Sequence, residues 1–198
     1  MPFFHLLERY GSAAAVLEGL PLLANKAGAK ADVRASSREE VEREIAAADK
    51  LGAMHRAACE PDYSACLAAL DAPPPIIFMR GRRELLNRPA IAMVGARDAS
   101  AVGRRMARDL ARQLGEAGYI IVSGMARGVD GEAHAAAMDT GTVAVRAGGI
   151  DMIYPPQHDR LYAMLAERGC LVSEAPPGDM AQARDFPKRN RIISGLSL

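Results

Sequence analysis

The residues with the clearest chemical meaning lie at positions 123–130, Ser-Gly-Met-Ala-Arg-Gly-Val-Asp. An apolar run at 119–122 precedes them, and a helix-like segment that contains His134 follows. A strand, a glycine-bearing turn and a helix in this order point backbone N–H groups at a helix N-terminus toward an anion. The guanidinium of Arg127 adds a forked cationic donor that suits phosphate. The pattern therefore predicts a phosphate-binding turn.

A second cluster combines an aromatic ring with cations. Phe186 is followed by Pro187, which can begin a helix, and then by Lys-Arg-Asn-Arg at 188–191. Cations are unfavourable at a helix N-terminus unless an anion binds there. Phosphate neutralisation together with base stacking is the chemistry of single-strand binding. This cluster therefore favours a nucleic-acid ligand.

Further candidate residues follow other apolar runs. Gly95-Ala96-Arg97 follows the run at 90–94, Gly148-Gly149 follows 142–145, and Ser173-Glu174 follows 170–172. Because the carboxyl ends of parallel strands meet at one sheet edge, these turns are expected to form one site. Glu174 is the best general-base candidate, but it stands alone, and His134 has no nucleophile beside it in the sequence. We therefore expect no enzyme activity, catalytic residue, cofactor or metal.

The elements that must position these turns alternate along the chain. Strands are predicted at 76–79, 90–94, 119–122, 142–145 and 170–173, with helices between them. In the helix predicted at 102–115, Val102, Met106, Leu110 and Leu114 form the apolar face. This alternation predicts an α/β fold with a Rossmann-like, doubly wound, mostly parallel sheet. We expect a small helical (SAM-like) domain at 1–70, a proline-rich linker at 71–75, and a DNA-binding domain at 76–198 whose sheet is truncated at its C-terminus.

Composition restricts the class of protein. The 198 residues include 25 basic and 24 acidic ones, so a nucleic-acid role must depend on local clusters. The three cysteines have no metal-binding spacing, and no signal peptide or ~20-residue apolar span is visible. We expect a cytoplasmic protein that does not contact a membrane.

Together the motifs resemble the DNA-processing protein A family (DprA/Smf). They lie at 93–97, 121–130, 133–134, 149–156, 171–178 and 186–197. The resemblance implies a protein that binds and protects incoming single-stranded DNA, dimerises at full length, and loads the recombinase RecA during natural transformation. It also implies a DNA-binding pocket, in which Phe186 serves as a stacking platform. The expected DNA- and phosphate-binding residues are Gly95, Arg97, Ser123, Gly124, Ala126, Arg127, Gly128, Gly148, Phe186, Lys188, Arg189, Asn190 and Arg191. Arg146 departs from the family pattern, which usually has an apolar residue there.

Two enzyme classes are alternatives. Nucleoside-monophosphate phosphoribohydrolases of the lysine-decarboxylase-like fold need a Pro-Gly-Gly-x-Gly-Thr turn and a catalytic glutamate. Residues 147–151 lack the Gly-Thr pair and the glutamate that should follow. A dinucleotide-dependent oxidoreductase is less favoured still, because Gly95-Ala96-Arg97 does not continue as GxGxxG.

Overall fold

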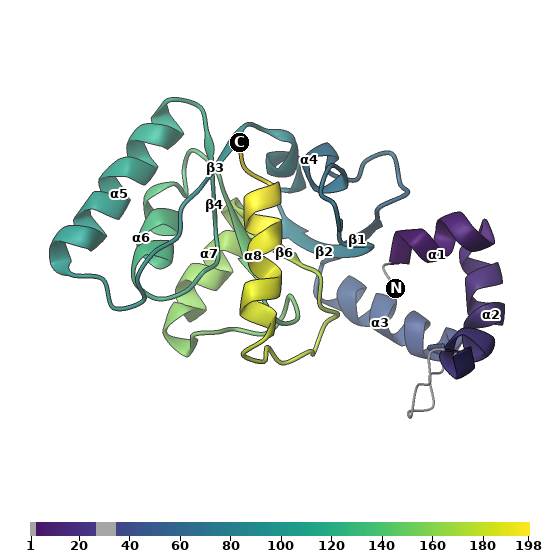
Figure 1. Cartoon of the computed structure of the whole chain (residues 1–198). Coiled ribbons are helices and arrows are strands. Elements are labelled where there is room, and N and C mark those ends of the chain that lie inside the picture. The colour runs from purple at the N-terminus through teal and green to yellow at the C-terminus, as the bar shows by residue number, and fades with distance from the viewer. Residues whose placement is uncertain (1–2, 27–34) are drawn as a thin grey trace. The chain divides into compact units, whose positions relative to one another are not determined.

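The computed structural model describes residues 3–26 and 35–198, which divide into two compact units, Met1–Ile45 and Ala46–Leu198. The first unit contains α1 (Phe3–Tyr10), α2 (Ala13–Lys26) and the start of α3 (Arg38–Lys50) (Figure 1). Ser37 begins α3 with a capping box: its hydroxyl accepts from the Glu40 N–H at 3.2 Å, and the Glu40 carboxylate accepts from the Ser37 N–H at 2.7 Å.

A six-stranded sheet organises the second unit, in the order β1-β2-β6-β5-β4-β3. The strands are β1 (Met54–Ala57), β2 (Ile76–Gly81), β3 (Ala90–Ala92), β4 (Ile120–Ser123), β5 (Thr142–Arg146) and β6 (Cys170–Ser173). From β3 to β6 neighbouring strands are parallel, whereas β2 is antiparallel to both β6 and β1. The expected mostly parallel sheet is therefore confirmed. Strand β1 was not predicted.

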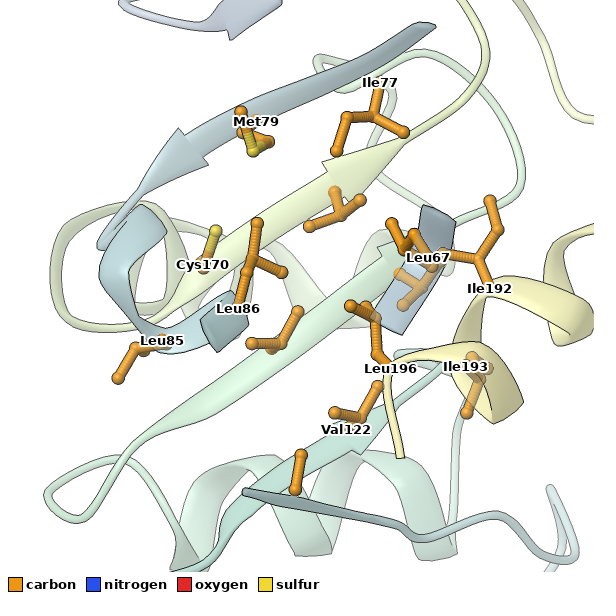
Figure 2. Packing of buried hydrophobic residues seen from close by; sticks show 14 of the residues in the cluster. Leu67, Ile77, Met79, Leu85, Leu86, Val122, Cys170, Ile192, Ile193 and Leu196 are labelled. Atoms are coloured by element: carbon orange, nitrogen blue, oxygen red, sulfur yellow. The ribbon is translucent and has the colours of Figure 1, made fainter. Parts of the chain in front are cut away.

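Helices cover both faces of this sheet, as expected. The helices are α4 (Ala65–Ala68), α5 (Ala101–Glu116), α6 (Val129–Ala136), α7 (Asp159–Arg168) and α8 (Asp185–Gly195), with short 3-10 turns η1 (Arg83–Asn87) and η2 (Pro156–His158). Successive side chains of a strand point to opposite faces. Val122 accordingly packs in one cluster with Ile192 of α8, while Ile121 packs with Ala111 of α5 and Ala133 of α6. Figure 2 shows the cluster on the α8 face, where Ile192, Ile193 and Leu196 meet Leu67 of α4 and Val122 of the sheet.

The division between the units differs from the expected linker at 71–75. Strand β1 pairs with β2, so that Met54 lies opposite Met79. The proline segment itself is held inside the second unit, because the Tyr63 hydroxyl donates to the Pro74 carbonyl at 2.7 Å and the Ala58 N–H donates to the Pro75 carbonyl at 2.9 Å. Prolines exclude a helix or a central strand. They do not reveal whether the segment is packed.

Helix α5 was predicted, but of the four residues on its expected apolar face only Leu114 packs against the core. Val102, Met106 and Leu110 are 77%, 61% and 42% exposed, whereas Ala107, Ala111 and Gly115 are buried. Small residues face the rest of the protein because α6 and the chain after it approach closely. A Cβ on Gly115 would lie 2.8 Å from Thr140 Cβ.

His134 is a structural residue of α6. The Thr142 hydroxyl donates to the Ile121 carbonyl at 2.8 Å, so it must accept from His134 Nδ1, 2.7 Å away. The other ring nitrogen, Nε2, is buried without a partner. Burial disfavours the charged ring, and together with the positive charges of His158, Arg146 and Arg189 it lowers the pKa of His134 to about 3.

Among residues 3–26 and 35–198, none of the helices has the length and apolar character needed to cross a bilayer.

We predict that the two faces of α5 respond oppositely to substitution. Met106→Ala should change the free energy of unfolding by at most ~0.5 kcal/mol, because the side chain is largely exposed. Ala111→Leu should cost ~1–3 kcal/mol, because the added carbons have no space. Urea denaturation of both variants measures the difference. If both variants lowered the free energy of unfolding equally, the face of α5 that carries Met106 would also be packed inward.

We also predict that His134 makes stability depend on pH. Its pKa is lower in the folded state than its usual value of 6.5, so the unfolded chain binds the extra proton. This contribution to stability is complete above pH ~6.5 and is lost progressively as the pH falls toward ~3. Between pH 6 and 5 the wild type should lose ~1 kcal/mol more than His134→Gln. Urea denaturation at these two pH values measures the change. If the free energy of unfolding changed equally in the wild type and in His134→Gln, the assignment would be contradicted.

Candidate nucleic-acid interface

The turn after β4 is folded around the carboxylate of Asp130. The N–H groups of Gly124 and Ala126 each lie 3.2 Å from the same oxygen of this buried carboxylate. Between them, Met125 has a φ of 61°, a conformation that residues other than glycine rarely adopt. The turn was expected to bind phosphate through its backbone N–H groups. This expectation is wrong for Gly124 and Ala126, because their N–H groups already donate to the Asp130 carboxylate. An external anion therefore cannot use the N–H groups of Gly124 and Ala126.

Two of the predicted binding glycines join neighbouring turns. Gly128 has a φ of 74°, and a Cβ there would lie 2.6 Å from the Arg97 carbonyl oxygen. A Cβ on Gly95 would lie 2.7 Å from a methyl of Val129. Both residues lack side chains so that the turn after β3 can pack against the start of α6. This packing brings Arg97 next to the turn after β4.

Arg189 of α8 reaches across the carboxyl ends of β4 and β5. Its Nη1 donates to the Gly124 carbonyl at 2.6 Å and to the Val145 carbonyl. A Cβ on Gly124 would lie 2.6 Å from this guanidinium, so the close approach requires glycine. Arg189 is only 8% exposed, and burial lowers its pKa, with a further decrease from Arg97 that the charge of Asp130 opposes. Arg189 takes part in none of the ion pairs found in the described part of the chain.

Arg146, the last residue of β5, is a second buried cation. Its Nη1 lies 2.7 Å from the Met125 sulfur and 3.4 Å from the Tyr154 carbonyl, and its Nη2 donates to the Met152 carbonyl. Its Nε is buried and has no hydrogen-bond partner. The side chain is 6% exposed, and burial lowers its pKa to about 10. Its guanidinium also lies 5.7 Å from the centre of the Tyr162 ring.

These side chains surround a pocket of about 480 Å³ at the expected edge of the sheet. Arg97 and Arg127 are exposed, whereas Arg146 and Arg189 are buried. The walls are apolar and aromatic. The lining residues are Arg97, Gly124, Met125, Ala126, Arg127, Arg146, Ala147, Gly148, Met152, Ile153, Tyr154, Pro155, Pro156, Gln157, Met180, Ala181, Phe186 and Arg189. This set contains four arginines and no carboxylate.

Phe186 is the centre of an aromatic and cationic group on the pocket wall. Its ring centre is 5.9 Å from that of Tyr154. The guanidinium of Arg97 lies 5.3 Å from the Phe186 ring centre, and that of Arg189 lies 6.0 Å from it. Flat π-faces flanked by cations match the chemistry of an unstacked base joined to a phosphate.

The structure brings about half of the predicted site residues together. Those that line the pocket are Arg97, Gly124, Ala126, Arg127, Gly148, Phe186 and Arg189. Gly95 and Gly128 instead pack the turns, as described above. Ser123 is buried and donates from its hydroxyl to the Met93 carbonyl at 2.6 Å, so it links β4 to the end of β3.

The rest of the cationic cluster lies beside Glu174. Lys188 and Arg191 are 3.4 Å and 2.6 Å from its two carboxylate oxygens. The Asn190 side-chain oxygen accepts from Arg189 Nε at 3.3 Å. Glu174, the candidate general base, is thus neutralised by two cations outside the pocket lining.

Sequence reasoning missed the opposite wall and the floor. Met125, Arg146, Met152, Tyr154 and Met180 line the pocket but were not predicted as site residues. Arg146 could have been found, since it also ends a buried apolar strand at the carboxyl edge. Met180 lies in an irregular segment that no periodic signal places.

An open α/β sheet with a cationic pocket outside the carboxyl ends of its parallel strands defines a Rossmann-like domain. The family profile described as DNA recombination-mediator protein A matches residues 55–198, and the DprA-like N-terminal HHH domain matches residues 1–47. The chain therefore belongs to the DNA recombination-mediator protein A family, as the sequence motifs indicated.

Relatives agree with this assignment. Protein Smf of Synechocystis is 39% identical over 70% of this chain and 36% of its own length. DNA processing protein DprA of Bacillus subtilis is 39% identical over 68% of this chain and 46% of its own length. The chain thus spans less than half the length of these relatives.

Two solved structures have the same fold. DNA processing protein A of Streptococcus pneumoniae superposes with a TM-score of 0.70 at 26% identity, covering 100% of this chain and 76% of that one. The Helicobacter pylori protein, studied for its single-stranded DNA binding mode, gives 0.65 at 29% identity, covering 73% and 66%.

We predict that Gly124→Ala disrupts the junction of α8 with β4 and β5. The new methyl would displace Arg189, so the free energy of unfolding should fall by ~1–3 kcal/mol. Gly103→Ala is the matched control, because its Cβ meets nothing closer than 3.4 Å and alanine favours a helix by ~0.5–1 kcal/mol. Urea denaturation compares the two. If Gly124→Ala left the free energy of unfolding unchanged, Arg189 would not be held against Gly124.

Proposed function

We propose that this chain binds single-stranded DNA at the pocket. Arg97 and Arg127, the exposed cations, contact backbone phosphates, and one unstacked base enters beside Phe186 and Tyr154. The observation that carries the proposal is a pocket lined by four arginines and no carboxylate, with an aromatic pair in its wall.

Size and charge support this ligand. A volume of about 480 Å³ is within the range of small-molecule pockets, ~300–1,000 Å³, and suits one nucleotide. Arg127 has only an exposed ion pair with Asp98 at 3.6 Å, which a phosphate can replace at little cost. The formal net charge of the chain is +1, so the attraction is local. The remaining predicted contacts, Lys188 and Arg191, would extend the path of the strand beyond the pocket.

Family membership supports a wider role. We propose that the whole protein protects incoming single-stranded DNA, forms a homodimer and loads the recombinase RecA during natural transformation. The measurement is RecA filament formation on single-stranded DNA coated with a single-strand binding protein, with and without the full-length protein.

A phosphoribohydrolase activity is disfavoured, since a hydrolase of this kind needs a carboxylate at the reacting sugar and the pocket lining contains none. Release of free base or ribose phosphate from nucleoside monophosphates would contradict our proposal that the protein binds without catalysis.

We predict that Arg127→Ala weakens single-stranded DNA binding by ~1–3 kcal/mol, through loss of a phosphate contact, and lowers the slope of log K against log salt concentration by ~1. Arg168→Ala is the matched control, because this exposed arginine pairs with Asp139 directly before β6, at the other edge of the sheet. Fluorescence anisotropy at several salt concentrations measures both. Unchanged binding by Arg127→Ala, or an equal loss in the control, would refute the site.

A further inference from the structure

We propose that Arg146 makes the pocket selective for the base that it receives, favouring guanine over adenine. The inference rests on the proposed binding of single-stranded DNA and assigns Arg146 the role of a specificity-determining residue. It depends on three features: the depth of Arg146, its unused hydrogen-bonding capacity and the charges around it.

Arg146 lies deeper than the predicted phosphate contacts. It lines the pocket although it is only 6% exposed, whereas Arg97, Arg127 and Tyr154 are exposed. A base that stacks against Phe186 therefore points its edge toward Arg146 while its phosphate stays near the exposed cations. The Arg146 guanidinium, at the floor of the pocket, therefore contacts the base rather than the DNA backbone.

The guanidinium of Arg146 has hydrogen-bonding capacity to spare. Its Nε–H is buried without a partner, which is costly in a protein interior. Its Nη1 bond to the Tyr154 carbonyl is long, at 3.4 Å, and the other Nη1 contact is to the Met125 sulfur, a weak acceptor. A base with strong acceptors can replace these contacts after a small rotation of the guanidinium.

Arg146 takes part in none of the ion pairs found among the described residues. None of the residues that line the pocket of about 480 Å³ is acidic, whereas Glu174, Asp179 and Asp185 line a smaller adjoining pocket that Arg146 also borders. Burial lowers the pKa of Arg146, and the charge of Arg189 lowers it further. The Tyr162 hydroxyl donates to the Ile150 carbonyl at 2.7 Å and accepts from Arg80 at 3.3 Å rather than from Arg146. The floor of the pocket is thus rich in donors and attracts a ligand edge rich in acceptors.

Guanine and adenine differ in this edge. Guanine presents O6 and N7, two acceptors that match the fork of an arginine, whereas adenine presents N7 beside an amino donor. The adenine amino group, itself a hydrogen-bond donor, would face the donors of the guanidinium and could not bond to them. Because both bases are purines of nearly equal size, the pocket volume does not separate them, and the hydrogen bonds do.

Anisotropy competition with oligonucleotides of deoxyadenosine tests the proposal, with every third base replaced by guanine, hypoxanthine or 2-aminopurine. The wild-type chain should bind the guanine and hypoxanthine strands, which carry O6, at least about five-fold more tightly than the adenine and 2-aminopurine strands, which lack it. Arg146→Met should lose this ratio, so that it binds the four strands with similar affinities. Arg146→Lys, which keeps the charge without the fork, should bind all strands with a reduced ratio.

The outcomes separate the two proposals. If the wild type binds none of the strands, the proposed function fails. If it binds all four equally, only the role of Arg146 is refuted. An equal loss on every strand in Arg146→Met would show a structural role and would also overturn the selectivity. The comparison of hypoxanthine with 2-aminopurine uses the wild type alone, so it remains decisive even if a variant does not fold.

Discussion

The buried guanidinium of Arg189 is the interaction on which the site depends. It joins α8 to the carboxyl ends of β4 and β5 through the carbonyls of Gly124 and Val145. This contact is possible because residue 124 has no side chain and because Asp130 draws the N–H groups of the same turn toward itself. Moving this arginine would shift the turn and the start of α8 together, and with them the pocket that they line.

A consequence of this arrangement is a concentration of positive charge in a nearly neutral chain. Arg146 and Arg189 are buried without ion pairs among the residues described, although burial of a cation is costly unless it is compensated. Carbonyl oxygens and the rings of Phe186 and Tyr162 provide partial compensation. An anionic ligand would supply the rest of the compensation. Two acidic side chains near this edge are used elsewhere, since Asp130 holds the turn and Glu174 holds Lys188 and Arg191.

Much of the fold could be predicted because its signals are local. The strands that became β2 to β6 are short apolar runs, and glycine-bearing turns follow several of them. The errors arose where packing decides. On α5, Val102 and Met106 have the right period for a helix, but a face of small residues packs closely against α6 instead. Likewise, Tyr63 holds the proline segment within the second unit, through a contact that no local pattern contains.

By itself the sequence determined the class of fold, the family, and the edge of the sheet at which ligand-binding residues gather, because strand order and turn composition are encoded in consecutive residues. Only the tertiary structure decided what each of these residues does. It assigned the N–H groups of Gly124 and Ala126 to Asp130, turned Arg189 inward, and placed Arg146 at the floor of the pocket. The physical reason is that a polar group bonds to whichever partner lies nearest once the chain has folded, and that partner can be far away in the sequence, as Gly124 is 65 residues from Arg189.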